Sequence, residues 1–158
     1  MSSEDRSALV ALFRSTGGTR WNENDNWDTD ADLSRWYGVK VNDDGRVVEL
    51  KLFFNNLEGI VPEAIGALTE LEVLGLSSNK LTGPIPETLG ALKELTIVNM
   101  GWNKITGSIP ASLGSLTKLQ TLGLYNNQLI GPIPEALGAL KELTHLWLGD
   151  NKITDKRR

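Results

Sequence analysis

The sequence predicts an α/β solenoid whose coils carry short parallel strands, preceded by a helix and a β-hairpin. Three observations indicate this architecture. A pattern of apolar residues, asparagine, glycine and proline returns every 24 residues, as the series Leu71, Leu95, Leu119 and Leu143 shows. Each copy contains apolar residues at the alternating spacing of a strand. All six prolines fall in the segment after the asparagine. A fixed period of this length is typical of a solenoid, which presents an extended surface rather than an enclosed pocket.

The N-terminal region carries the signals of one helix and one hairpin. Ser3 and the two acidic residues after it are typical of a helix start, and apolar residues at helical spacing predict a helix over about 4–15. The glycine pair at 17–18 ends this helix. Further on, alternating apolar residues flank an Asp-Gly turn at 44–45, which predicts a β-hairpin over 38–50. The second strand of the hairpin is also the first strand of the repeat array.

Three tryptophans, Trp21, Trp27 and Trp36, lie between the helix and the first repeat. We expect them to seal the N-terminal end of the leucine stack, because that end would otherwise expose apolar surface. The chain therefore divides into three parts: an N-terminal cap over 1–46, four full repeats and a truncated fifth over 47–154, and a charged tail over 155–158.

Each copy of the repeat predicts the same succession of local structures. In the copy that begins at Leu71, residues 71–76 alternate as in a short strand whose leucines point inward. Asn79 follows where the chain must turn, and its side chain can bond backbone groups that the turn leaves without partners. Glycine and proline hold 81–86 as a second extended segment, and 87–92 predicts a tight 3₁₀ or helical turn. Stacked copies place their strands in one parallel sheet and bury one another's leucines.

The positions between and after the inward leucines vary from copy to copy, while the framework stays constant. Because strand side chains alternate between two faces, we expect these positions on the outer face of the sheet. Large aromatic residues on such a face are typical anchors of an interface. As the alternative, the two phenylalanines pack against the cap, and the two tryptophans shield neighbouring backbone. The candidate binding residues are Phe53, Phe54, Asn99, Trp102, Tyr125, His145, Trp147 and Asp150.

Charge and composition argue against several function classes. The net charge of −4 and the lack of a basic stripe disfavour nucleic-acid binding, and no apolar run reaches membrane-spanning length, so no membrane insertion is expected. The chain has no cysteine, and its single histidine, His145, forms no evident relay with a serine and an aspartate. The aspartates of 28–32 match the first ligand positions of a calcium-binding loop. Leu33 and Val39, however, stand where that loop needs Gly and Glu. We therefore expect no enzyme, no metal site and no cofactor.

The repeat resembles the plant-type leucine-rich repeat, L-x-x-L-x-x-L-x-L-x-x-N-x-L-x-G-x-I-P-x-x-L-G-x, over residues 47–154. The preceding segment resembles the capping domain of plant leucine-rich-repeat receptors, which carries C-x-W-x-G-V-x-C. Ser34 and Val41 stand where its two cysteines would be, and the matching positions are Trp36, Gly38 and Val39. The resemblance implies a right-handed leucine-rich-repeat solenoid with its parallel sheet on the concave face, short 3₁₀ turns on the convex side, and a helix–hairpin cap without a disulfide. Members of this family are mostly ligand-binding or co-receptor ectodomains and inhibitors of cell-wall-degrading enzymes.

Together, these observations predict non-catalytic recognition of a protein or peptide partner across the concave sheet, as part of a larger signalling or defence-type protein. Two alternatives stay open: carbohydrate recognition or inhibition of a carbohydrate-active enzyme, and an architectural segment with no ligand of its own. The fifth copy stops after Thr154, so we expect one of three outcomes: further repeats in the native protein, end-to-end self-association, or fraying. The lack of cysteine, N-x-[ST] sequon and signal peptide favours a cytoplasmic location, whereas the family resemblance favours an extracellular one.

Overall fold

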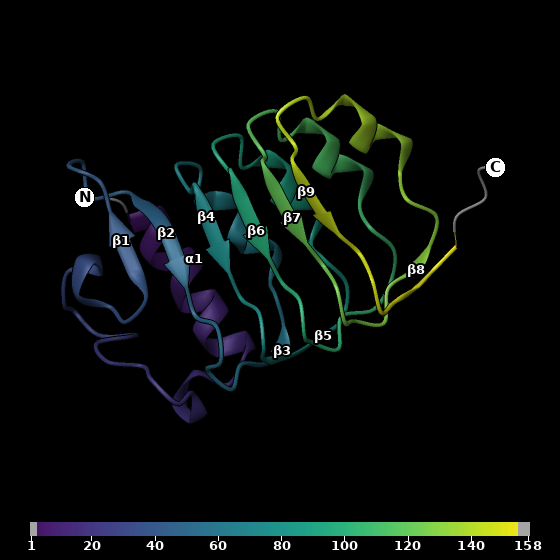
Figure 1. The fold of residues 1–158 in the computed structure, drawn as a ribbon. Coiled ribbons are helices and arrows are strands. Elements are labelled where there is room, and N and C mark those ends of the chain that lie inside the picture. The colour runs from purple at the N-terminus through teal and green to yellow at the C-terminus, as the bar shows by residue number, and fades with distance from the viewer. Residues whose placement is uncertain (1–2, 155–158) are drawn as a thin grey trace.

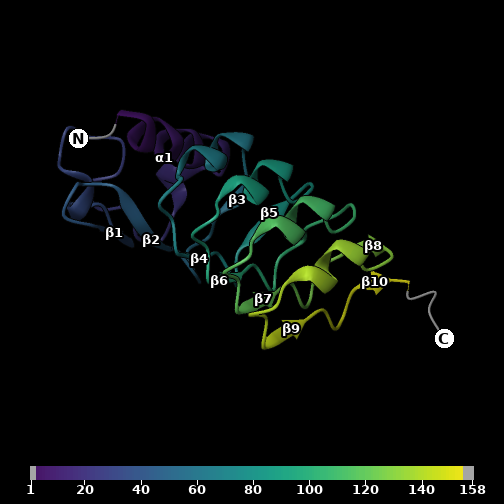
Figure 2. The same ribbon diagram turned by 90° about the horizontal axis from the view of Figure 1, so that it is seen from above.

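A computed structural model describes residues 3–154, which wind as a right-handed solenoid from the N-terminal helix to the last repeat (Figure 1). The strands of the main sheet line one side of the solenoid, and short 3₁₀ helices line the opposite side (Figure 2). This arrangement confirms the predicted fold class. The charged tail expected at 155–158 lies outside the described residues.

The N-terminal elements match the predicted helix and hairpin. Helix α1 spans Ser3–Ser15, so Ser3 is the first residue of the helix rather than its cap. Its apolar face is buried because Ala8, Leu9, Leu12 and Phe13 face the repeats. Strand β1 (Val39–Val41) pairs antiparallel with β2 (Val47–Lys51), with a shift of register between Lys40 and Val41. Two short 3₁₀ helices, η1 (Gly18–Arg20) and η2 (Leu33–Arg35), lie between α1 and β1.

The main sheet has six strands in the order β1-β2-β4-β6-β7-β9, and it is parallel from β2 onward. Its register follows the repeat: Val73 pairs with Ile97, and Thr121 pairs with His145. Each residue therefore lies beside its equivalent in the next copy, so the columns of the sequence are also columns on the sheet. The four repeat strands that follow β2 are β4 (Val73–Gly75), β6 (Ile97–Asn99), β7 (Thr121–Gly123) and β9 (His145–Trp147).

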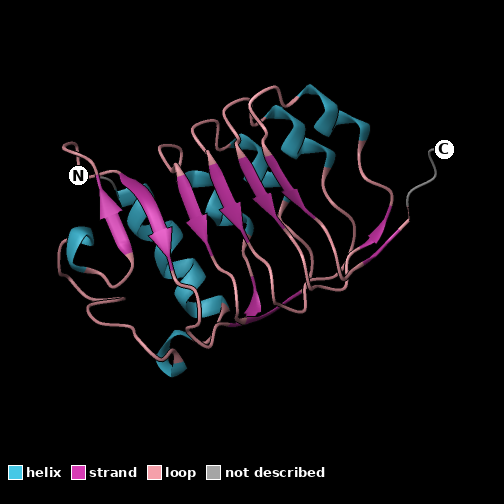
Figure 3. Ribbon diagram, in the orientation of Figure 1, coloured by secondary structure: helices cyan, strands magenta, loops and turns pink. Residues whose placement is uncertain are grey.

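A second layer and a row of turns complete each coil, as Figure 3 shows in magenta and cyan. The second layer consists of two parallel pairs, β3 (Glu58–Ile60) with β5 (Lys80–Thr82) and β8 (Ile130–Gly131) with β10 (Lys152–Ile153). A proline in extended conformation precedes every 3₁₀ helix of the repeats, because its fixed φ holds the flank straight up to the turn. These helices are η3 (Glu63–Ala67), η4 (Glu87–Ala91), η5 (Ala111–Ser115) and η6 (Glu135–Ala139).

Successive 3₁₀ helices approach within backbone contact. A Cβ atom added to Gly90 of η4 would lie 2.5 Å from the carbonyl oxygen of Ser112, and one added to Gly114 of η5 would lie 2.6 Å from that of Ala136. Real Cβ atoms essentially never come this close to another heavy atom. Gly138 of η6 occupies the same position in the last coil, where a Cβ atom would meet nothing within 4 Å.

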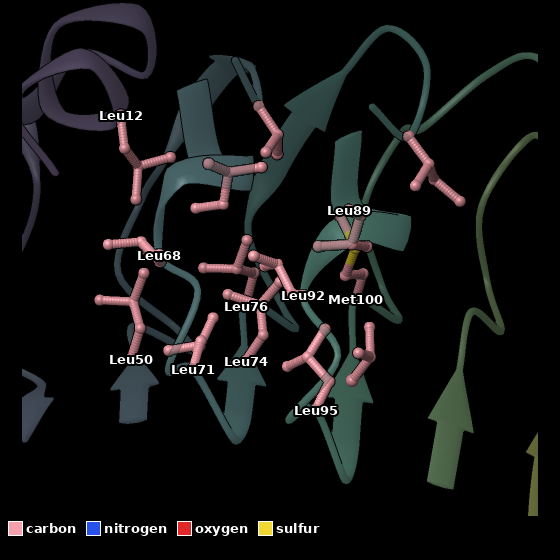
Figure 4. Close-up of a cluster of buried hydrophobic side chains, with 14 of the residues drawn as sticks. Leu12, Leu50, Leu68, Leu71, Leu74, Leu76, Leu89, Leu92, Leu95 and Met100 are labelled. Carbon is pink, nitrogen blue, oxygen red and sulfur yellow. The ribbon is translucent and has the colours of Figure 1, made fainter. Parts of the chain in front are cut away.

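The core is one continuous cluster that runs the length of the solenoid. Figure 4 shows leucines from the strands, such as Leu74 and Leu76, meeting leucines from the side of the 3₁₀ turns, such as Leu68 and Leu92. All four are completely buried. Burial of one such side chain contributes about 1.5–3 kcal/mol, and here it depends on the neighbouring coils, which supply the surrounding atoms.

The repeated asparagine organises each turn through backbone bonds. The Oδ1 atom of Asn79 accepts hydrogen bonds from the backbone N–H groups of Asn55 and Leu57, both at 2.9 Å. Its Nδ2 atom donates to the carbonyl oxygens of Leu52 and Leu76, both at 3.0 Å. The asparagines thus connect neighbouring coils through the backbone rather than through one another. Asn103, Asn127 and Asn151 repeat the pattern.

The N-terminal end of the core is covered by a chain of aromatic rings. The ring centroids of Phe13 and Trp21 lie 5.3 Å apart, those of Trp21 and Trp27 4.7 Å apart, and those of Trp27 and Trp36 5.0 Å apart. All four rings are buried in the same cluster as the first leucines of the repeats. Asn55 bonds the backbone of Glu23 here, at 2.7 and 2.9 Å, so this loop takes the place of a preceding coil.

A partly buried ion pair joins α1 to the residue that precedes the first repeat strand. The completely buried Asp5 accepts hydrogen bonds from Nε of Arg46 at 3.0 Å and from the backbone N–H of Val47 at 2.9 Å. The hydrogen bond with Asp5 raises the pKa of Arg46 above the ordinary value of an arginine.

In residues 3–154, no helix is both long enough and apolar enough to cross a bilayer.

Candidate functional site

The outer face of the six-stranded sheet is the broadest exposed surface built from the variable positions. We call it the sheet face. Its side chains point outward because the residues between them, such as Leu74 and Leu122, are completely buried in the core. The sheet face consists of Glu49, Lys51, Val73, Gly75, Ile97, Asn99, Thr121, Gly123, His145 and Trp147. The residues that follow the strands extend this face towards the turns.

The predicted aromatic residues are exposed to solvent. The side chains of Phe53 and Phe54 are 54% and 80% exposed, so neither is buried against the cap. Trp102 and Trp147 are 56% and 47% exposed. Tyr125 is half-buried. Exposed rings of this size contribute little to the core of the solenoid, which leaves them free for contact with a partner.

Tyr125, His145 and Trp147 form one aromatic cluster near the C-terminal end of the sheet face. Tyr125 and Trp147 meet edge to face with centroids 6.0 Å apart, and His145 and Trp147 do so at 5.3 Å. The Tyr125 ring lies over Gly101, where a Cβ atom would come within 2.7 Å of it. The small residue at the same position of the preceding coil therefore gives the ring its place on the sheet.

The remaining predicted residues are apart from this cluster. The Oδ1 atom of Asn99 accepts a hydrogen bond from the backbone N–H of Gly101 at 3.1 Å, so the side chain is partly committed to its own turn. Asp150 accepts a hydrogen bond from Asn126 at 3.4 Å. Within the cluster, Nδ1 of His145 lies 2.9 Å from the Thr144 hydroxyl. The structure thus brings together only some of the eight predicted residues.

Charges on the sheet face are confined to its two ends. Glu49 lies 3.3 Å from Nζ of Lys51 and 3.9 Å from Nζ of Lys40, so charges of opposite sign meet at the N-terminal end. Asp150 is near the other end. Between them, the face is made of Val73, Ile97, glycines and neutral polar residues. The described range 3–154 contains no group of three His, Asp or Glu residues that could hold a metal ion.

Two hollows close to Phe54 and Trp102 were not predicted. One, of about 430 Å³, is lined by Phe54, Ser78, Asn79 and Trp102. The other, of about 240 Å³, also touches Phe54 and adds Lys80 to its lining. Sequence reasoning missed Ser78 and Lys80 because neither is unusual by type. The 24-residue spacing of Phe54, Ser78 and Trp102 was the signal that could have grouped them.

The C-terminal end of the stack is open in the described part of the chain. Leu146 of β9, equivalent to fully buried leucines in earlier coils, is 38% exposed. A hollow of about 320 Å³ adjoins it, lined by Leu137, Gly138 and residues around Pro134. The outer edge of β9 has no strand paired to it among residues 3–154. Apolar side chains and unpaired backbone groups therefore coincide at this end.

Family models of the leucine-rich repeat match two segments of the chain, 46–105 and 118–140. A comparison with curated protein sequences finds no match.

Solved plant structures are similar over most of the chain. The BIR2 ectodomain from Arabidopsis thaliana is 29% identical, with a TM-score of 0.88, and the match covers 95% of this chain and 81% of that one. The ectodomain of the receptor kinase GASSHO1/SCHENGEN3 from Arabidopsis thaliana, in complex with CASPARIAN STRIP INTEGRITY FACTOR 2, is 34% identical with a TM-score of 0.87; coverage is 94% of this chain and 18% of that one. The plant peptide hormone receptor RGFR1, in complex with RGF2, is 43% identical with a TM-score of 0.65, over 65% of this chain and 16% of that one.

Proposed function

Because this chain belongs to the plant-type leucine-rich repeat proteins, we propose that it is a non-catalytic recognition module that binds a protein or peptide partner. The recognition surface is the sheet face with its flanking aromatic residues, and the module is part of a larger signalling or defence-type protein. The observation that carries this proposal is the set of large rings, above all Trp102 and Trp147, that stand exposed on a rigid framework without supporting its core.

The chemistry of the sheet face supports a protein or peptide partner. Its centre is uncharged and partly apolar, and aromatic rings flank it, which is the composition of the central part of protein interfaces. Parallel strands in fixed register hold these rings, so little conformational entropy is lost when a partner binds. Two of the similar solved structures are receptors in complexes: GASSHO1/SCHENGEN3 with CASPARIAN STRIP INTEGRITY FACTOR 2, and RGFR1 with RGF2.

Alanine substitution on the two sides of the solenoid tests the proposal. Once a partner has been identified by cross-linking to the full chain, its affinity is measured by calorimetry. We expect Trp102→Ala or Trp147→Ala to weaken binding by about 2 kcal/mol or more, because buried aromatic anchors dominate interface energies. Lys141→Ala, an exposed change beside the last 3₁₀ turn, is the matched control and should change the affinity little. Equal losses on both sides would contradict recognition by the sheet face.

The open end supports a second partner, another copy of this chain. The exposed Leu146 and the free edge of β9 lie together there, and an unpaired strand edge is a template for pairing with another chain. Two copies would associate end to end and continue the sheet. Sedimentation analysis tests this: the unmodified chain should show a concentration-dependent dimer, and Leu146→Glu should be a monomer. A dimer that persists in Leu146→Glu would place the contact elsewhere.

A further inference from the structure

The residue directly before each repeated turn asparagine, three positions after the sheet strand ends, has an unusual backbone. Phe54, Ser78, Trp102, Asn126 and Asp150 all have positive φ, between 56° and 59°. This left-handed conformation is tolerated best by glycine, asparagine and aspartate, and it costs other L-residues roughly 1–2 kcal/mol. Phenylalanine and tryptophan are therefore poor choices for this position. Because both rings are also mostly exposed, neither the turn nor the core accounts for them.

The two rings stand on either side of a small residue. Phe54 and Trp102 are two coils apart, with Ser78 at the same position of the coil between them. Neighbouring strands lie about 4.8 Å apart, so the backbones that carry the two rings are separated by about 10 Å. A flat group packs about 3.5–4 Å from an aromatic ring, so one such group fits between the two. The hollow of about 430 Å³ between these residues is the corresponding space, and we call it the aromatic slot.

The polar groups that line the aromatic slot are mostly engaged already. Asn79 uses both ends of its amide: Oδ1 accepts two backbone hydrogen bonds, and Nδ2 donates to three carbonyl oxygens. Among the lining side chains, this leaves the Ser78 hydroxyl and the Trp102 indole N–H as the two polar groups without a hydrogen bond within residues 3–154. A sugar presents many hydroxyl groups that need partners, whereas an aromatic ring needs almost none. The lining therefore favours an aromatic side chain over a carbohydrate.

Two lysines beside the slot indicate which charges accompany that side chain. Lys80 and Lys104 directly follow the turn asparagines of successive coils and are exposed. Lys80 lines the smaller hollow that adjoins Phe54. Neither lysine forms an ion pair in the described part of the chain, although Glu58 lies opposite Lys80 in the β3–β5 pair. Unpaired positive charge at this edge complements carboxylates that flank the aromatic ring of a partner.

Building on the proposed function, we propose that the aromatic slot holds one aromatic side chain of an extended acidic segment of the partner. The ring lies between Phe54 and Trp102, and carboxylates next to it in sequence face Lys80 and Lys104. The partner is thus recognised by an aromatic residue with acidic neighbours, rather than by general apolar contact with the sheet face.

Titration with short probes, followed by the NMR signals of the tryptophan indole N–H groups, tests this proposal. The probes are three blocked pentapeptides with a central tyrosine flanked by aspartate, serine or lysine, and the oligosaccharide cellopentaose. We expect the aspartate peptide to shift the Trp102 signal and to bind at least about tenfold more tightly than the lysine peptide. Trp147, on the sheet face outside the slot, is the internal control and should shift little.

Matched variants separate binding from folding. Trp102→Asn and Phe54→Asn place in the slot the residue that Asn126 supplies in the same column, so the melting temperature should stay unchanged or rise. Each should weaken binding of the aspartate peptide at least about tenfold. Lys80→Ala combined with Lys104→Ala should remove the advantage of the aspartate peptide over the serine peptide. A large loss of stability in Trp102→Asn would overturn the proposal, because the ring would then be structural.

The possible outcomes distinguish a failure of the slot proposal from a failure of the proposed function. Shifts at Trp147 without shifts at Trp102 would refute the slot and leave peptide binding by the sheet face standing. A shift of Trp102 with cellopentaose and none with the peptides would assign the slot to carbohydrate and refute an acidic aromatic ligand. No shift at either indole with any peptide at millimolar concentration would contradict the slot, while partner binding by the full sheet face is still judged by Trp147→Ala.

Discussion

Replacing Asn127 by alanine tests how much one turn asparagine contributes to stability. Asn127 is buried, and its Oδ1 atom accepts a hydrogen bond from the backbone N–H of Ile105 at 3.0 Å. Its Nδ2 atom donates to the carbonyl oxygens of Met100 and Leu124, both at 3.1 Å, and of Tyr125 at 3.3 Å. The alanine variant loses all four bonds.

The loss of unfolding free energy is smaller than four lost hydrogen bonds suggest, because each of the three carbonyl groups keeps another donor. These are Nδ2 of Asn103 for Met100, Nδ2 of Asn151 for Leu124, and the backbone N–H of Trp102 for Tyr125. Only the N–H of Ile105 is left without an acceptor. An orphaned buried donor costs about 1–3 kcal/mol, so we expect Asn127→Ala to lower the free energy of unfolding by about 2 kcal/mol.

Urea denaturation measures the loss, and amide exchange of Ile105 shows where it arises. Asn151→Ala is the matched control: the equivalent bond to Leu129, at 3.0 Å, lies in the open last coil, where water can replace it. We expect the control to lose less than about 1 kcal/mol. A loss well above 4 kcal/mol in Asn127→Ala, or unchanged exchange at Ile105, would refute the reasoning that a single orphaned donor sets the cost.

Further outcomes follow from the ends and the turns. Asp5→Ala should destabilise the chain by about 1–3 kcal/mol in thermal or urea unfolding, because it leaves the buried N–H of Val47 without an acceptor; wild-type stability would rule this out. A chain that begins at Arg46 should aggregate or melt much lower, since the aromatic rings over the leucine stack are gone. Amide exchange should be faster across 143–153 than across 71–124 in a monomeric sample; equal rates would show that the open end is not frayed. Gly114→Ala should cost about 1–3 kcal/mol through its clash with η6, whereas Gly138→Ala should be nearly neutral.

The repeat period made most of the fold predictable. Once Leu74 is assigned to a strand, its equivalents 24 residues away must lie beside it, so the sheet, its register and the buried leucines follow. The turn asparagine was predictable for the same reason, because a side chain with one acceptor and two donors suits a turn that leaves backbone groups unpaired. Strand length was less predictable: β2 ends at Lys51 and β6 at Asn99, so Phe54 and Trp102 belong to turns that follow the sheet.

The details of the candidate site depend on geometry that the pattern does not contain. The column of Phe54, Ser78, Trp102, Asn126 and Asp150 has no shared backbone preference, and its positive φ comes from the closure of the coil. The position of Tyr125 over Gly101 depends on a side-chain rotamer and on the space that this glycine leaves in the preceding coil. The contact of Asp5 with Arg46 joins residues far apart in the sequence, which no periodicity relates.

The backbone contacts between successive 3₁₀ turns have a consequence for how this scaffold can change. On the side of the 3₁₀ turns, glycines such as Gly90 and Gly114 let backbone carbonyl oxygens set the distance between coils. On the side of the main sheet, the hydrogen bonds between strands set that distance. Both spacings are thus fixed by the main chain, so the bend of the whole molecule is independent of which side chains the sheet presents. Residues on the sheet face can be exchanged one column at a time without reshaping the surface that carries them. New specificity in such a chain requires only new side chains, while every partner meets the same rigid curvature.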